Sequence, residues 1–154
     1  MSKFSNCVLF GAVAFLTVAG AAQATELKKY DTPEAVVDAH VAFLNKCDLE
    51  GLMSQYPDEA EFHLPDGVVL KGPAAIRDLF EKGLCAPVAD GGLAGLQIIP
   101  ESTFTVGDTV NVMWRAEAPY LATPYKGSDA YVTKDGLMYA QVTTFKGADL
   151  DMKK

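Results

Sequence analysis

The sequence predicts an α+β domain in which helices pack on one face of a curved, largely antiparallel sheet. Apolar residues recur at helical spacing up to about residue 82, and two short extended segments interrupt that pattern. From residue 96 onward the pattern changes to the two-residue alternation of half-buried strands. Helices followed by a run of strands are typical of α+β folds rather than of alternating α/β folds.

The first helix is predicted over residues 33–46. Thr32 is a good N-cap, Pro33 suits the first helical position, and the following apolar residues gather on one side of a helical wheel. His40 lies in the middle of that side, where a leucine would be expected. A buried histidine is commonly a core residue satisfied by a hydrogen bond. It could also face a pocket as a hydrogen-bond donor or a general base.

The next elements are shorter, and turn residues separate them. The sequence predicts a helix over residues 48–55 capped by Asp48, strands over 61–64 and 68–71, and a third helix from Gly72 to Gly83. Residues 85–95 are expected to form a flexible loop, because glycine and alanine dominate them.

The second half of the chain reads as strands over residues 96–106, 109–118, 128–134 and 137–145. In the second of these, Val110, Val112, Trp114 and Ala116 alternate with residues of the opposite face. Asp135-Gly136 predicts a two-residue hairpin turn between the last two strands. Residues 119–127 contain two prolines and two tyrosines and are predicted to form a loop.

Residues 1–24 are set apart from this domain by their composition. Lys3 precedes the apolar run VLFGAVAFLTVA, and the small-residue sequence AQA ends at Ala24. This order is typical of a secretory signal peptide, and the run is shorter than the ~20 residues of a membrane-spanning helix. We therefore expect cleavage after Ala24, rather than a membrane anchor. The remaining single domain, residues 25–154, would then lie in the periplasm or outside the cell.

The charge of residues 25–154 argues against nucleic acid as a partner. They contain 12 basic and 20 acidic residues, a net charge of −8, and the basic residues are scattered. Nucleic-acid binding needs clustered Lys and Arg. No nucleotide-binding or hydrolase motif is present in the sequence, and its two histidines lie in different elements without a carboxylate at ligand spacing. We expect no cofactor, no metal and, after signal cleavage, no membrane association.

Two cysteines remain after residue 24, Cys47 and Cys85. An even pair in an exported protein is consistent with a disulfide. Two buried free thiols are the alternative, because the sequence alone does not show whether the two Cα atoms lie close enough for a bridge. The absence of a C-x-x-C motif makes redox catalysis an unattractive hypothesis.

Three phrases of the sequence resemble one known family: TPEAVVDAHVAFLNKCDLEGLM, GPAAIRDLF and the closing strand YAQVTTF. They are similar to the nuclear transport factor 2-like superfamily, and most of all to its steroid Δ-isomerase and SnoaL-like branches. The resemblance runs from about Thr32 to Phe145. It implies a cone-like α+β barrel in which three N-terminal helices pack on a strongly curved antiparallel or mixed sheet.

The resemblance also implies site residues. Steroid isomerases carry a Tyr on the first helix and an Asp on a late strand, which donate hydrogen bonds to the substrate oxyanion; another Asp, in the first short strand, moves the proton. His40 falls at the Tyr position and Asp129 at the oxyanion Asp, so these are the candidate catalytic residues. Leu64 falls at the proton-moving Asp and cannot act as a base. His63 should face the other side of its strand, and Asp66 lies in a turn.

Six further residues are candidates for lining a ligand pocket: Phe43, Trp114, Tyr120, Tyr125, Tyr131 and Met138. Aromatic and methionine side chains at such spacing are more often plain core residues, and loop tyrosines often only anchor the loop. Asp129 could likewise be an ordinary surface carboxylate at the edge of a strand rather than a site residue. Arg115 and Glu117 alternate away from Trp114, so they are expected in solvent or at a dimer interface.

The superfamily resemblance leaves three functions open. The first is an exported pocket protein that binds a small, mostly apolar molecule with a carbonyl or hydroxyl group. The second is an isomerase, dehydratase or cyclase that uses His40 and Asp129 as an acid–base pair and lacks the usual base. The third is a homodimeric interaction module without catalysis. One fold hosting many functions is common, so the site has to decide among them.

Overall fold

The computed structural model describes residues 26–154. The predicted signal peptide, residues 1–24, therefore lies outside the described residues. Between residues 26 and 154, no helix has the length and apolar character needed to cross a membrane.

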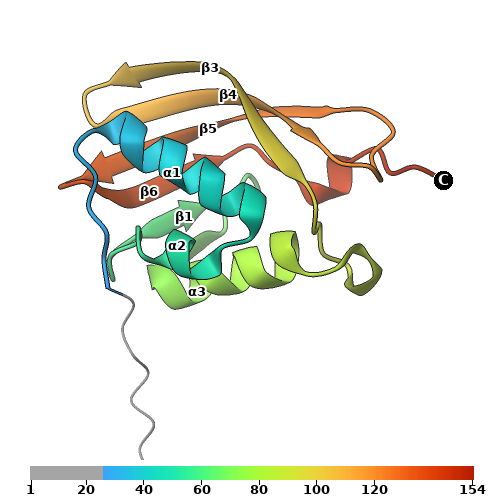
Figure 1. The fold of residues 1–154 in the computed structure, drawn as a ribbon, viewed down its shortest axis with the longest axis horizontal. Coiled ribbons are helices and arrows are strands. Elements are labelled where there is room, and N and C mark those ends of the chain that lie inside the picture. Colours follow the sequence, from blue (N-terminus) through green and yellow to red (C-terminus); the bar gives the residue numbers. More distant parts are fainter. Residues whose placement is uncertain (1–25) are drawn as a thin grey trace, which may run out of the picture.

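A six-stranded mixed sheet forms the larger part of the fold (Figure 1). Its strands, in the order in which they lie side by side, are β2 (Val69–Lys71), β1 (Glu61–His63), β6 (Leu137–Thr143), β5 (Tyr125–Lys134), β4 (Thr109–Glu117) and β3 (Gln97–Val106). Neighbouring strands are antiparallel except β1 and β6, which are parallel. The α+β prediction is confirmed.

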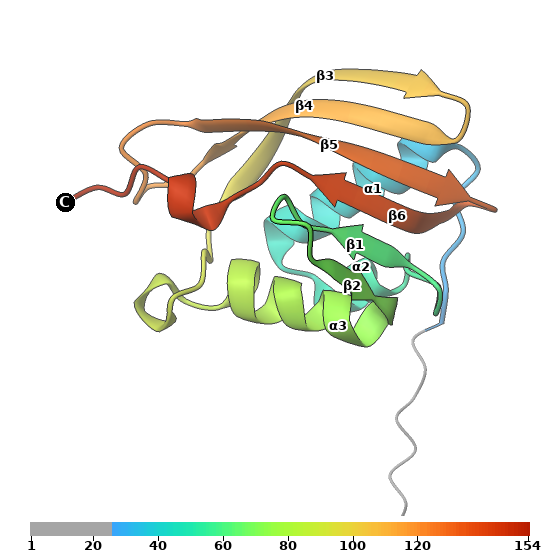
Figure 2. The same cartoon turned by 180° about the vertical axis from the view of Figure 1, so that it is seen from behind.

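The predicted barrel is wrong in one respect, because the sheet is not closed. β2 and β3 are its two edges, and no ladder joins them. β2 and its neighbour β1 have three residues each, so this edge offers little backbone for pairing with another strand. Helix α3 and the loop that follows it occupy the space between these two edges instead (Figure 2).

The helices lie on one face of the sheet. α1 (Pro33–Lys46) crosses it diagonally against β3, β4, β5 and β6 (Figure 1). α2 (Leu49–Met53) is little more than one turn, and α3 (Gly72–Leu79) packs beside β1 and β2 (Figure 2). Because β1 and β2 come between α2 and α3 in the chain, the helices do not form the single N-terminal group that the resemblance implies.

α1 begins and ends as its sequence predicts. The Thr32 hydroxyl accepts a hydrogen bond from Ala35 N at 3.1 Å, and Pro33 follows it. Cys47 ends the helix in the left-handed conformation. Its apolar side, including His40, is buried against the sheet. The second helix is shorter than predicted, because its last residues leave the helix and Gln55 turns its side chain inward to bond Val36 O at 2.8 Å.

The predicted end of the third helix at Gly83 is wrong. After Leu79 the chain continues as a π-helix, Phe80–Cys85, that passes through Gly83. Gly83 keeps a right-handed backbone, so it does not supply the left-handed turn that ends a helix. The following loop includes a short 3-10 turn, Val88–Asp90, and Ala94 N closes it by bonding Ala86 O.

The long strands follow the predicted alternation. Val110, Val112, Trp114 and Ala116 of β4 are all buried, and the residues between them are not. The Asp135-Gly136 hairpin is also confirmed, since both residues have positive φ, 52° and 79°. Only glycine fits the second position, because an added Cβ would lie 2.4 Å from Tyr30 O. β5 begins at Tyr125, three residues earlier than predicted.

Candidate ligand-binding cavity

A cavity of about 360 Å³ lies between the inner face of the sheet, the end of α1 and the π-helix. Its walls are mostly apolar: Leu44, Phe62, Leu64, Leu79, Leu84, Leu93, Ile98, Trp114, Tyr131 and Phe145. Three glycines, at positions 83, 91 and 147, also line it. Its polar groups gather at one place on strands β5 and β6.

Strand pairing brings these polar groups together. Asp129 and Tyr131 are alternate residues of β5, and Gln141 and Thr143 are alternate residues of β6, so each pair points to one face of the sheet. In the β5–β6 ladder Asp129 lies opposite Thr143, and Tyr131 lies opposite Gln141. All four line the cavity, and we refer to them as the polar cluster. Sequence reasoning missed Gln141 and Thr143.

The Asp129 carboxyl is the centre of the polar cluster. Its Oδ2 accepts hydrogen bonds from Tyr131 OH at 3.0 Å and from Gln141 Nε2 at 2.9 Å. Its Oδ1 accepts one from Thr143 Oγ1 at 2.7 Å. Behind the cluster, the buried hydroxyl of Tyr56 donates to Gln141 Oε1 at 3.0 Å. Every member of the polar cluster therefore has a hydrogen-bond partner within the cluster.

Burial raises the pKa of Asp129, which is 8% exposed. The donor groups of Thr143, Trp114, Gln141 and Tyr131 around the carboxyl oppose this shift by stabilising the charged form. The Trp114 indole Nε1 is near the carboxyl but does not reach hydrogen-bond geometry, and this buried donor has no partner. Burial, followed by the charge of Asp129, raises the pKa of Tyr56 and of Tyr131 well above the usual value. Both phenols are therefore neutral donors.

His40 is fully buried beside the polar cluster but does not line the cavity. Its ring packs among Tyr56, Phe80 and Tyr131, with centroids 6.0, 5.8 and 5.5 Å away. Neither ring nitrogen makes a hydrogen bond. Burial lowers the pKa of His40 to about 4, and the nearby Gln55 side chain opposes that shift. His40 is thus neutral at physiological pH, and no hydrogen bond joins it to Asp129.

The structure confirms that an apolar side chain occupies the position at which steroid isomerases carry their proton-moving Asp. Leu64 follows β1 and lines the cavity. His63 points away and lies 3.0 Å from Glu61 Oε2, while Asp66 accepts from Val68 N in the turn. Among the residues that line the cavity in the described part of the chain, Asp129 is the one charged or titratable group apart from the phenol of Tyr131.

The other predicted pocket residues divide into three groups. Trp114 and Tyr131 line the cavity, as predicted. Tyr125 packs behind it on Trp114 and Phe145, with ring centroids 5.9 and 5.6 Å away. The remaining three pack elsewhere: Tyr120 donates to Leu93 O at 2.7 Å, Met138 is fully buried, and Phe43 packs against Gly51.

Cys47 and Cys85 are joined by a disulfide, with their Cα atoms 5.5 Å apart. The bridge connects the end of α1 to the end of the π-helix. Leu84, next to Cys85, and Leu44, three residues before Cys47, both line the cavity. The disulfide therefore holds together two walls of the cavity. No group of three or more His, Cys, Asp and Glu side chains within residues 26–154 is arranged to hold a metal.

The opposite face of the sheet, which we call the outer face, exposes apolar side chains. Cross-strand pairing places Val69, His63, Val142, Ala130, Asn111 and Phe104 in one row across all six strands. Phe104 and Met113 are each 55% exposed and Val142 is 46% exposed.

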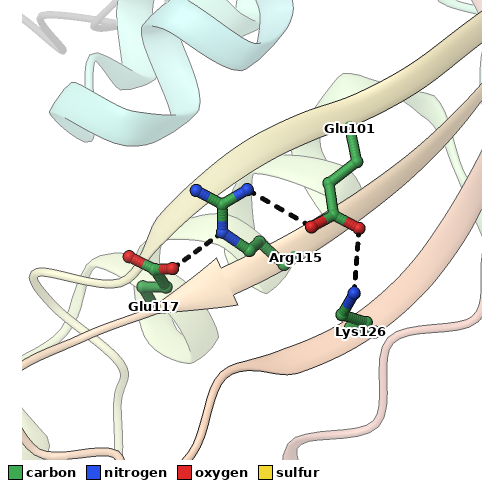
Figure 3. A network of polar contacts seen from close by, with 4 residues as sticks. All are labelled: Glu101, Arg115, Glu117 and Lys126. Carbon is green, nitrogen blue, oxygen red and sulfur yellow. Dashed lines mark hydrogen bonds and ion pairs between the residues drawn. The ribbon is translucent and has the colours of Figure 1, made fainter.

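An ion-pair network lies on β3, β4 and β5 (Figure 3). In it Arg115 contacts Glu117 and Glu101 at 2.7 and 3.3 Å, and Lys126 contacts Glu101 at 3.2 Å.

Comparison with known proteins gives a family and a fold. A family model described as a SnoaL-like domain matches residues 37–147. None of the curated proteins matches the chain.

Among solved structures, the chain is similar to an NTF2-like protein of unknown function from Cytophaga hutchinsonii, with 15% identity and a TM-score of 0.60 over 79% of this chain and 96% of that one. It is also similar to a computationally designed 17-OHP binder, with 16% identity and a TM-score of 0.63 over 81% and 99%. A third is SalBIII, an epoxide hydrolase/cyclase-like enzyme of pyran ring formation in salinomycin, with 15% identity and a TM-score of 0.62 over 79% and 95%. At these identities the likeness shows the fold alone.

Proposed function

This chain belongs to the SnoaL-like domain family, and from that membership and its cavity we propose that it binds a small, mostly apolar molecule carrying a hydroxyl or carbonyl group. The observation that supports this most directly is a single carboxyl group, Asp129, in an otherwise apolar cavity. Small-molecule sites typically measure ≈ 300–1,000 Å³ and combine apolar walls with a few polar groups that orient the ligand. The designed 17-OHP binder has the same fold, which supports binding as a use of this architecture.

Binding is favoured over catalysis because Asp129 lacks a partner for proton transfer on the cavity wall. Leu64 occupies the position of the family's base, and His40 does not line the cavity. An acid–base pair needs two groups within hydrogen-bond reach of the reacting atoms. The second titratable group on the cavity wall is the phenol of Tyr131, which is neutral and donates its proton to Asp129, so it does not supply the missing base.

We propose further that the protein is exported and acts as a homodimer. The signal-like segment of residues 1–24 supports export, and so does the Cys47–Cys85 disulfide, because disulfides persist in oxidising compartments. The exposed apolar side chains of the outer face support self-association, because monomers rarely expose a contiguous apolar patch of large size.

Trp114 makes the binding proposal easy to test, because it lines the cavity and is the one tryptophan of the chain. Its emission should change when neutral apolar compounds such as naphthalene derivatives are titrated into the oxidised protein. Gly83→Phe should weaken this binding at least about tenfold, because the new ring would occupy the cavity. The backbone accepts the change, since an added Cβ at Gly83 meets only Leu79 Cδ1, at 3.9 Å.

Lys82→Phe is the matched control, because the same ring is added at an exposed neighbouring position. It should leave binding unchanged. Equal affinity of the Gly83→Phe and Lys82→Phe proteins would show that the compounds bind elsewhere. If no apolar compound binds the unaltered protein, the proposed function is wrong.

A further inference from the structure

We propose that the cavity selects ligands whose polar group donates a hydrogen bond, and hydroxyl groups in particular, over carbonyl and ether acceptors. This rests on the proposed function and makes it more specific. Its basis is the direction of the hydrogen bonds in the polar cluster, all of which point toward Asp129. In the family's steroid isomerases the corresponding Asp donates to the ligand, so the polarity inferred here is the reverse.

Tyr56 sets the direction of the first bond. Its buried hydroxyl donates to Gln141 Oε1, so the amide nitrogen of Gln141 is the atom that faces Asp129 Oδ2. Turning the amide around would place its oxygen against a carboxyl oxygen and would leave the Tyr56 proton facing an N–H group. Gln141 is therefore held as a donor to Asp129.

The other two bonds have the same direction. Thr143 Oγ1 accepts a hydrogen bond from Phe145 N at 3.0 Å, which leaves its own proton free to point at Asp129 Oδ1. Tyr131 is neutral because its pKa is raised, and its hydroxyl proton points at Oδ2. An ionised carboxyl accepts about four hydrogen bonds and donates none, so three donors suit the charged form of Asp129.

One acceptor position remains, and the cavity is where it can be filled. Oδ2 accepts two bonds, whereas Oδ1 accepts one, and Asp129 lines the cavity. A ligand O–H or N–H would complete the set. A carbonyl or ether oxygen would instead place two acceptors against each other, and an anion would be repelled. An oxygen that donates to Asp129 could also accept from the unpartnered Trp114 N–H, which an ammonium group cannot do.

Asp129 is the titratable group that should govern the pH dependence of this selectivity. The groups around it are Tyr131 on β5, Trp114 on β4, Gln141 and Thr143 on β6, Tyr56 after α2 and, behind the rings of Tyr56 and Tyr131, the neutral His40 of α1. None of these carries a charge at physiological pH. Hydroxyl binding should therefore be tight when Asp129 is ionised and should weaken as the pH falls through its raised pKa. Acceptor ligands should show the opposite trend.

The test uses one apolar skeleton with different polar groups: 2-naphthol, 2-methoxynaphthalene, 2-(aminomethyl)naphthalene and naphthalene, each titrated calorimetrically into the oxidised protein. At neutral pH the naphthol should bind at least about tenfold more tightly than the methyl ether, since a hydrogen bond to a charged group is worth that much or more. The ammonium compound should bind more weakly than the naphthol. The preference for naphthol should decline on acidification.

Two variants separate the effect of Asp129 from a general loss of structure. Asp129→Asn keeps the shape but offers N–H groups to the cavity, so the preference should turn toward the methyl ether. Asp38→Asn, an exposed change on α1, is the matched control and should keep the preference of the unaltered protein. Asp129→Leu should bind naphthol and its ether equally.

Equal affinity of the unaltered protein for naphthol and its methyl ether would overturn this inference while leaving the proposed function intact. Tighter binding of the ammonium compound than of naphthol would overturn the choice of a hydroxyl. If none of the four compounds binds, the proposed function itself fails, and this inference fails with it.

Discussion

His40 brings two ring nitrogens into the core without a hydrogen bond for either. The helical pattern of residues 33–46 predicts its burial, and the structure confirms that placement. The pattern does not predict its surroundings. Three aromatic rings from other elements enclose the imidazole, so it is neither a satisfied core histidine nor a residue of the cavity wall. Its polarity is uncompensated, which has consequences for stability.

We predict that His40→Leu stabilises the protein by about 1–3 kcal/mol at neutral pH, because it replaces an unpaired buried polar group by an apolar one of similar size. Urea denaturation measures the change. Ligand binding should persist, since His40 does not line the cavity. A less stable variant would show that the imidazole makes an interaction that compensates its burial.

His40 also predicts how the stability depends on pH. Its folded pKa of about 4 lies below the ordinary 6.5, so its titration leaves the free energy of unfolding unchanged above pH 6.5 and lowers it as the pH falls toward 4, because the unfolded chain binds the proton first. The loss should reach about 3 kcal/mol. Unfolding free energies measured between pH 7.5 and 4.5 should therefore fall further in the unaltered protein than in His40→Leu. Parallel curves for the two proteins would contradict this.

In the β5–β6 hairpin the turn can be predicted from the sequence, but the register of the two strands cannot. Its turn at Asp135-Gly136 is predictable from the two residues. If the pairing continued without interruption from Lys134 and Leu137, Asp129 would lie opposite Val142, whose side chain belongs to the outer face. A register shift between Val132 and Thr133 instead places Asp129 opposite Thr143. No local residue signals that shift, so the polar cluster is visible only in three dimensions.

The π-helix and the disulfide are a second element-level feature. We predict that Cys47→Ala with Cys85→Ala lowers the free energy of unfolding by about 3–4 kcal/mol, because the bridge closes a loop of 38 residues in the unfolded chain. Ligand affinity should also fall, since the bridge joins two cavity walls. Urea unfolding and Trp114 titration measure the two effects. A dithiol reductant should reproduce them in the unaltered protein and leave the double variant unchanged.

Across the whole molecule, the sheet separates two faces of different chemistry, for which we propose different roles. The inner face carries the polar cluster and the core, while the outer face presents exposed apolar residues beside the ion-pair network of Arg115 (Figure 3). The inner face supports ligand binding within one chain. The outer face supports association between chains, which is the proposed homodimer.

We predict that Met113→Lys shifts the protein from dimer to monomer, because it places a charge among the apolar side chains of the outer face, where Met113 is 55% exposed. Sedimentation velocity measures the assembly state. Val88→Lys is the control, since Val88 is also an exposed apolar residue but lies in the loop after the π-helix. If both variants sediment as the unaltered protein does, the outer face is not the interface.

The α+β class, most element boundaries, the family and the inward faces of α1 and β4 can all be predicted from the order of the residues. Those features depend on local periodicity, caps and turns, which are written in neighbouring residues. The open sheet, the place of His40 behind the cavity, and the meeting of Gln141 and Thr143 with Asp129 become visible in the folded chain. These depend on register, on the short β1 and β2, and on packing between distant segments. The hydrogen-bond polarity of the cavity is a property of that packing, because the direction of each bond is set by groups that meet only in the folded chain.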